Sequence, residues 1–199
     1  MIPIVTTLKA ACLAVLLCMP TVISAQEEDF SIVEVDSTWR QEILQFPIDW
    51  TPKMNVQGFE ELRFAPHWPD KNHEEFWSLV MSWSIISDSE ISPEDLKLNL
   101  EGYFDGLMKP NHWAKEFPEP NVTFFEFTKT IKGTSFKGTM HFFDGFHSGE
   151  LITTHILGSQ VLCKTTGKTI IIFKFSPQEY GSPVWDQLNN INMKDHICN

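Results

Sequence analysis

The alternation of hydrophobic and polar positions is sharpest between Phe76 and Ile86, where large apolar side chains occupy every second position. A period of two is typical of a strand with one deeply buried face. The opposite face carries Val80 and three small side chains (Ser78, Ser82, Ser84). We expect this small face either to lie under a helix or to floor a pocket, and we favour packing.

Helical periodicity begins after Ser92. The run Ser92-Pro93-Glu94-Asp95 supplies an N-cap, a proline at the first helical position and an acid that completes a capping box. Apolar residues then recur at helical spacing (Leu96, Leu100, Tyr103, Phe104, Leu107). The spacing predicts a helix that ends at Lys109-Pro110. Gly102 and Gly106 would let another backbone approach it closely.

Four further segments read as strands, because they are rich in β-branched and aromatic residues. Residues 122–131 and 134–143 flank a short turn, and residues 151–163 and 168–176 flank another, so we expect an antiparallel meander. Ser182-Pro183 then opens a short amphipathic helix.

The fold class that follows is α+β. We expect an antiparallel sheet of about five to six strands: a two-strand start, a helix, a four-strand meander and a C-terminal helix, with the helices packed on the sheet. Residues 39–68 contain three prolines (Pro47, Pro52, Pro66) and are followed by Pro69, so they predict only short extended pieces joined by turns.

The first 25 residues have the pattern of an export signal. Lys9 precedes an apolar run, and Ile23-Ser24-Ala25 offers small residues for cleavage. We therefore expect a signal peptide over residues 1–25 and one globular domain over residues 26–199, secreted or periplasmic, without an integral membrane segment after cleavage. Cys12 and Cys18 would leave with the signal.

The net charge limits the classes of binding partner, and the cysteine content predicts a disulfide. The formal net charge of −11 repels phosphate backbones, so nucleic acid is not expected as a partner. Two cysteines, Cys163 and Cys198, remain after cleavage. We expect them to form one structural disulfide in an oxidising compartment, with two buried thiols as the alternative.

One segment offers groups for a polar ligand. Glu61 and Arg63 are two apart, so on a strand both project to one side, and His67 and Trp68 follow a proline turn. We take these four residues as candidate ligand-binding residues. The structural alternative, which we favour, is that the Glu61–Arg63 pair fastens a loop.

A second candidate site is a metal centre. If the strands containing His141 and His155 pair, the two histidines could lie near each other, with Asp144 or His147 completing a ligand set from the loop. The spacing matches no recognised zinc pattern. Structural or exposed histidines are the preferred interpretation.

Several motifs in the first half of the expected domain resemble an uncharacterised group of exported bacterial proteins. They are Trp39-Arg40, Phe46-Pro47, the run from Gly58 to Trp68 and Phe76-Trp77-Ser78. The resemblance implies a periplasmic or secreted setting and no catalysis. The order of strands and helices is also similar to PsbP/Mog1-type domains, which are mostly binding or assembly factors.

No convergent catalytic set is present: the sequence contains no nucleophile elbow, Walker A motif or dinucleotide fingerprint. We expect an extracytoplasmic, non-catalytic protein that binds an unidentified protein or small molecule and needs no cofactor. The alternative is a metal-dependent hydrolase using the His141 and His155 region. Asn121-Val122-Thr123 is a glycosylation sequon, relevant only in a eukaryotic source.

Overall fold

The computed structural model describes residues 30–109 and 118–199; the expected signal segment, with Cys12 and Cys18, lies outside the described residues. The main strands are β2 (Arg40–Phe46), β3 (Gly58–Phe64), β4 (Leu79–Ile86), β5 (Asn121–Thr130), β6 (Gly133–Phe143), β7 (Leu151–Cys163) and β8 (Lys168–Ser176). They form one antiparallel sheet in the order β2-β3-β4-β8-β7-β6-β5. Short β1 (Val33–Glu34) and β9 (Asn192–Met193) pair separately.

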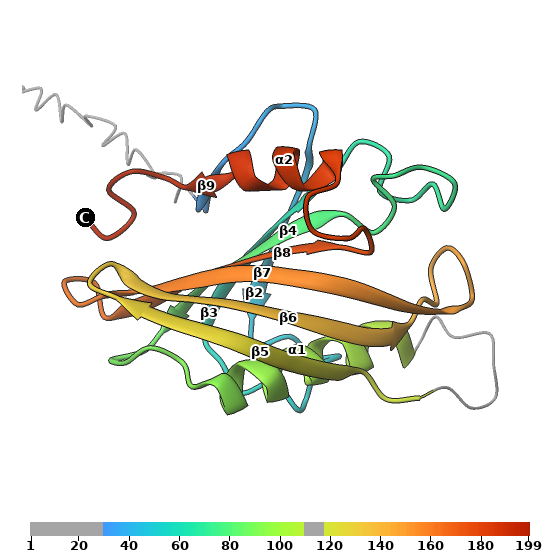
Figure 1. Ribbon diagram of the computed structural model, residues 1–199. Coiled ribbons are helices and arrows are strands. Elements are labelled where there is room, and N and C mark those ends of the chain that lie inside the picture. Colours follow the sequence, from blue (N-terminus) through green and yellow to red (C-terminus); the bar gives the residue numbers. More distant parts are fainter. Residues whose placement is uncertain (1–29, 110–117) are drawn as a thin grey trace, which may run out of the picture.

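Two helices cover opposite faces of this sheet, as Figure 1 shows. α1 (Pro93–Met108) carries the chain from β4 in the middle of the sheet to β5 at its edge. α2 (Pro183–Asn190) lies on the other face, beside β9. Within the described residues, neither helix is long and apolar enough to cross a membrane.

The α+β class is confirmed, but the expected strand count is too low. The seven-stranded sheet starts with three paired strands before α1, and β1–β9 adds a second small sheet. The three prolines of residues 39–68 and the following Pro69 explain the error, because all four lie in the connections that follow β2 and β3. They leave both strands uninterrupted, each seven residues long.

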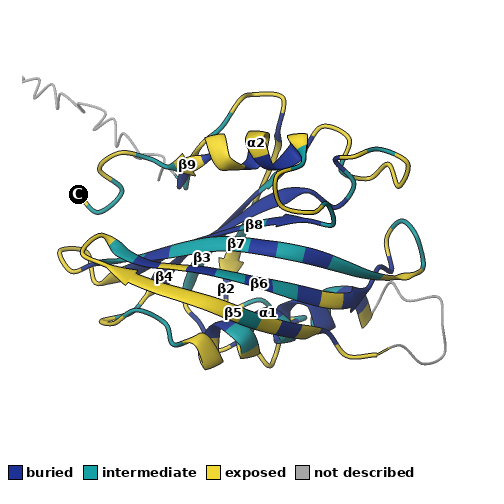
Figure 2. Cartoon of the chain, in the orientation of Figure 1, coloured by how far each residue is buried: buried dark blue, intermediate teal, exposed yellow. Residues whose placement is uncertain are grey.

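The sheet separates two hydrophobic cores. One lies between the sheet and α1 and takes the large side chains of β4, including Met81 and Trp83. The other lies between the sheet, β1 and α2, and takes Val80 of β4 and Trp185 of α2. Ser78, Ser82 and Ser84 are buried on this second side. Figure 2 shows the central strands buried and β5 largely exposed along the sheet edge.

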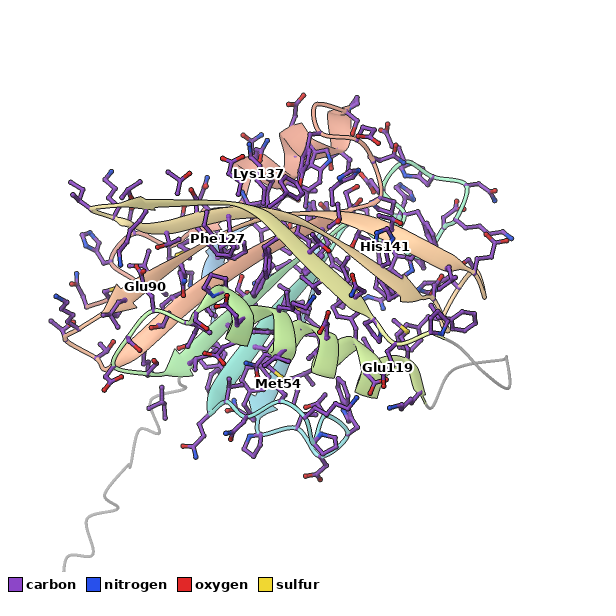
Figure 3. The ribbon with its side chains drawn as sticks, turned by 60° about the horizontal axis from the view of Figure 1, so that its bottom comes forward. Met54, Glu90, Glu119, Phe127, Lys137 and His141 are labelled. Atoms are coloured by element: carbon purple, nitrogen blue, oxygen red, sulfur yellow. A yellow bond between two sulfur atoms is a disulfide. The ribbon has the colours of Figure 1, made fainter. Side chains whose placement is uncertain are left out.

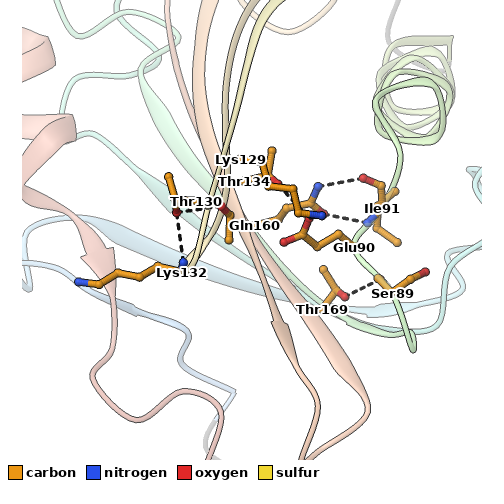
Figure 4. Close-up of polar contacts among 10 residues, drawn as sticks. Ser89, Glu90, Ile91, Lys129, Thr130, Lys132, Thr134, Gln160 and Thr169 are labelled. Carbon is orange, nitrogen blue, oxygen red and sulfur yellow. Dashed lines mark hydrogen bonds and ion pairs between the residues drawn. The ribbon is translucent and has the colours of Figure 1, made fainter.

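The start of α1 is fixed to the sheet by polar contacts (Figure 4). The side chain of Gln160 accepts a hydrogen bond from the backbone N–H of Ile91 and donates one to its carbonyl, both at 2.9 Å. Thr134 donates to Glu90 at 2.9 Å, and Thr169 donates to the carbonyl of Ser89 at 2.8 Å. The predicted cap is present as well, since Ser92 Oγ accepts from the backbone N–H of Asp95 at 3.1 Å.

The segment between β2 and β3 crosses α1 at its two glycines. A Cβ atom on Gly106 would lie 2.1 Å from the carbonyl oxygen of Trp50, and one on Gly102 would lie 3.0 Å from Cβ of Lys53. Lys53 also pairs with Asp105 of the helix at 2.9 Å. Figure 3 shows Met54 of this segment next to α1. The close approach expected at the glycines is confirmed, and it places Trp50 against the helix.

Cys163, the last residue of β7, and Cys198 near the C-terminus lie within bonding distance. Their Cα atoms are 4.9 Å apart, as the predicted disulfide requires. The bond would hold the C-terminal tail to the sheet.

Candidate functional site

A cavity of about 390 Å³ opens between the C-terminal half of α1 and strands β2 to β4. Seven of its lining residues are aromatic: Trp50, Phe64, Trp68, Trp77, Tyr103, Phe104 and Phe146. Leu44, Leu62, Leu79, Met81 and Leu107 complete the apolar wall, and Arg40 and Glu42 are the charged residues that line it. This volume and composition are typical of small-molecule sites, which are mostly apolar with a few placed polar groups.

The strand register orders the polar groups along the wall. On the α1 side of the sheet, Arg40 is opposite Phe64, Glu42 is opposite Leu62, and Leu44 is opposite Glu60. Arg40 and Glu42 are exposed, so they lie where the cavity meets solvent. Glu60 is not among the lining residues, but Leu44 and Leu62 beside it are.

Glu60 is a fully buried acid with 0% of its surface exposed. Neither carboxyl oxygen accepts a hydrogen bond from the described residues. Burial raises the pKa of Glu60 to about 8, and the nearby hydroxyl of Tyr103 and indole of Trp83 oppose the rise only in part. Glu60 is therefore mainly protonated at neutral pH.

Trp77 is the centre of the aromatic wall and has an unusual backbone. Its φ is +50°, in the left-handed region that bulky residues rarely adopt. Its ring centroid lies 5.6 Å from that of Trp68 and 4.9 Å from that of Phe142. Such conformations cost about 1–3 kcal/mol and cluster at functional sites. The backbone strain at Trp77 therefore makes this wall of the cavity a candidate functional surface.

The loop between β6 and β7 closes one end of the cavity. Asp144 is fully buried there and accepts hydrogen bonds from the backbone N–H groups of Phe146, His147 and Ser148 and from the hydroxyl of Ser148. Burial acts to raise the pKa of Asp144, but these hydrogen bonds outweigh it, and the pKa lies below the usual value. The charged carboxylate thus fixes the loop, and with it Phe146 at the cavity.

His147 belongs to the same aromatic cluster. Its ring centroid is 4.7 Å from Trp68, and Nε2 is buried without a hydrogen-bond partner among the described residues. Burial lowers the pKa of His147, with a smaller opposing effect from Asp144. A neutral ring here packs as an aromatic side chain.

The predicted Glu61, Arg63, His67 and Trp68 group is divided between the two faces of the sheet. Glu61 lies on the α2 side, where its carboxylate accepts from the backbone N–H groups of Ile32 and Val33, from Gln41, and from Arg63 at 2.7 Å. These contacts fasten the segment that contains β1, which is the structural alternative described above.

His67 and Trp68 lie in the turn after β3. His67 is exposed, with its ring 4.2 Å from that of His73. Trp68 turns to the other side and lines the cavity. Of the four candidates, Trp68 alone lines the cavity, and ligand binding by the other three stays a prediction.

His141 and His155 lie on paired strands, as expected, but each has a different neighbour. His141 pairs in register with Thr153 and shares a hydrogen bond with its hydroxyl at 2.6 Å. His155 lies 3.6 Å from Glu179 and stacks near Tyr180. Across residues 30–109 and 118–199, no group of three or more His, Cys, Asp or Glu side chains is arranged to hold a metal ion.

Comparisons of the chain with models of protein families, with curated proteins and with solved structures find no match.

Proposed function

We propose that this chain is a non-catalytic binding protein that holds a small, mainly apolar ligand in the cavity between α1 and strands β2 to β4, and that it works outside the cytoplasm. The observation that carries the proposal is the cavity itself, about 390 Å³ with mostly apolar and aromatic walls. Protein interiors are close-packed, and apolar voids of this size are few. The cavity lies beside a tryptophan with a strained backbone, and this combination supports a role in ligand binding.

Two features favour binding over catalysis. The charged residues that line the cavity are Arg40 and Glu42, both exposed on the edge strand β2, and the buried acid beside them lacks a basic partner. Nucleophilic catalysis needs a nucleophile and a base within hydrogen-bond reach of each other, and the described residues that line the cavity include no Ser, Thr, Cys, Lys or His. The export signal and the disulfide expected from the sequence support the extracytoplasmic setting.

Titration with a neutral, apolar fluorophore, N-phenyl-1-naphthylamine, tests the proposal. We expect saturable fluorescence enhancement with one site per chain. Leu107→Trp places a larger side chain in the cavity wall and should weaken binding about tenfold or more. Leu98→Trp is the matched control, because it makes the same change on the same helix at a side chain that is 60% exposed.

The control should bind as the wild type does, and near-ultraviolet circular dichroism verifies that both variants are folded. Absence of saturable binding to the wild type, or equal weakening in both variants, would contradict the proposal.

A further inference from the structure

The cavity walls carry features that select the charge of a ligand. Half of the lining residues are aromatic, and among them Trp50 and Tyr103 meet edge to face, with 5.2 Å between ring centroids. The faces of tryptophan and tyrosine rings carry negative electrostatic potential and attract cations, most strongly where water is excluded. Aromatic walls of this kind can therefore bind a positively charged group as well as an apolar one.

Carboxyl groups adjoin these aromatic walls. Glu42 lines the cavity directly. Glu60 lies on the same face of the sheet, next to three residues that line the cavity, since it is opposite Leu44, two positions before Leu62 and beside Tyr103. Glu42 is near enough to Glu60 to act on its ionisation. Glu42 and the Trp50–Tyr103 pair thus line one end of the cavity, and Glu60 lies behind its wall.

Glu60 has weak polar neighbours for a buried acid, because the Tyr103 hydroxyl and the Trp83 indole act on its ionisation without completing a hydrogen bond of normal geometry. Both of its oxygens are without a hydrogen bond from the described residues, although the side chain is completely buried. Buried polar groups in native proteins are almost always satisfied, because leaving one without a partner is costly. A cationic group bound beside Glu60 would donate hydrogen bonds to the carboxyl group and, by favouring its charged form, would displace the proton that it carries at neutral pH.

We propose that the ligand of this cavity carries an amine or other cationic nitrogen group, which binds at the Trp50–Tyr103 end beside Glu42 and Glu60, while its apolar part fills the rest of the cavity. This inference rests on the proposed function. The net charge of −11 would also attract such a ligand to the protein.

Arg40 is the group that argues for the opposite charge. Arg40 lines the cavity two residues before Glu42 on β2, opposite Phe64, and its guanidinium could bind a ligand carboxylate. Its side chain is exposed, however, so water and salt screen its interactions. Glu60 is fully buried, so its interaction with a cation that displaces its proton is screened much less. The cationic ligand is therefore favoured over the anionic one.

The test compares three probes that share a naphthalene ring and differ only in the polar group: 1-naphthylmethylamine, 1-naphthalenemethanol and 1-naphthaleneacetate. Binding of each to the wild type is measured by calorimetry at pH 7. We expect the amine to bind about tenfold more tightly than the alcohol, and the carboxylate more weakly than the alcohol.

Variants of the two acids then show which residues cause the preference for the amine. Glu60→Gln should reduce the amine-to-alcohol ratio to about two or less, and Glu42→Gln should reduce it partly. Glu34→Gln is the matched control, because Glu34 is an exposed acid of β1 on the other side of the sheet, and it should leave the ratio unchanged.

The outcomes separate this inference from the proposed function. If the amine binds no more tightly than the alcohol, the inference is wrong and the cavity remains an apolar binding site. If the carboxylate binds most tightly, the inference is wrong and Arg40 is the selecting group. If none of the three probes binds and N-phenyl-1-naphthylamine also fails, the proposed function is wrong.

Discussion

Glu60 and Glu61 are adjacent acids that the same chemical change should affect in opposite ways. Both are completely buried on β3, but they point to opposite faces of the sheet. Glu61 accepts hydrogen bonds from four residues, among them Arg63, whose side chain is only 14% exposed. Glu60 accepts none from the described residues. Replacing each with glutamine keeps the size and removes the charge.

Glu61→Gln should destabilise the protein strongly. The new amide can accept through one oxygen, so its NH2 group must face either the Arg63 guanidinium or the backbone N–H groups of Ile32 and Val33. Breaking a buried ion pair by removing one partner costs about 3–5 kcal/mol, because the remaining charge stays buried. For a domain of this size, that corresponds to a fall of roughly 6–20 °C in the melting temperature.

Glu60→Gln should be nearly neutral below pH 4.5, where the carboxyl group is protonated in both states, and stabilising at pH 7, where the unfolded wild type gains from ionising it. The pKa of Glu60 is raised by burial from 4.5 to about 8 in the folded protein. The folded state therefore holds a proton that the unfolded state releases between pH 4.5 and 8. The wild type loses stability as the pH rises through this window, whereas Glu60→Gln does not. The variant should therefore become the more stable protein as the pH rises above 4.5, with a gain that levels off near pH 8.

Urea unfolding, followed by tryptophan fluorescence at pH 5, 7 and 8.5, measures these free energies of unfolding. A loss below about 1 kcal/mol for Glu61→Gln at pH 7 would show that the Arg63 contact contributes little and would refute the reasoning. A loss for Glu60→Gln that grows with pH would show that Glu60 is charged and paired in the folded state.

Three further predictions concern other parts of the molecule. The Cys163–Cys198 bond spans 35 residues, so Cys163→Ala with Cys198→Ala should cost about 4 kcal/mol in the free energy of unfolding; intact mass spectrometry after thiol labelling checks that the wild type has no free thiol at either cysteine. Burial lowers the pKa of Lys174 to about 8, so the unfolded state binds more protons between pH 8 and 10.5. Lys174→Met should therefore be more stable than the wild type at pH 7, and this gain in stability should shrink from pH 8 upward. Lys168→Met, at an exposed site of β8, is the control and should show no such gain; thermal unfolding measures both variants. Gly106→Ala should lower the melting temperature and weaken fluorophore binding, because its Cβ would meet the backbone of Trp50, whereas Gly102→Ala, which meets a side chain at 3.0 Å, should cost less in both assays.

The parts of the fold that the sequence predicts well are those set by local chemistry. Capping residues and turns are neighbours in the chain, so Ser92 marks the start of α1, and β7 and β8 have the expected bounds. β2 and β3 were underestimated for the same reason, because nearby prolines suggested interruption. Their pairing with β4 depends on partners that are distant in sequence.

The cavity could not be predicted in the same way, because it is a space between elements. Its walls join residues from Arg40 to Phe146, and no spacing along the chain relates them. An aromatic residue that lines a cavity is also indistinguishable in sequence from one that fills a core, so the pattern at Trp77 and Tyr103 predicts packing alone. Trp68 is the one candidate that lines the cavity, and the sequence singles it out by its neighbours rather than by its ring.

The two buried acids of β3 differ in how completely their carboxyl oxygens are satisfied, and this difference bears on function. On the α2 side, a buried acid is surrounded by donors that hold β1 in place. On the α1 side, the buried acid is unpartnered, and a tryptophan with positive φ lies in the wall of the same cavity. Natural proteins tolerate such costs mainly where function requires them. If the α1 side served stability alone, the burial of Glu60 and the strained backbone of Trp77 would cost free energy without a return. A ligand in the cavity could offset the cost of burying Glu60 and could contact the ring that the backbone of Trp77 holds in place.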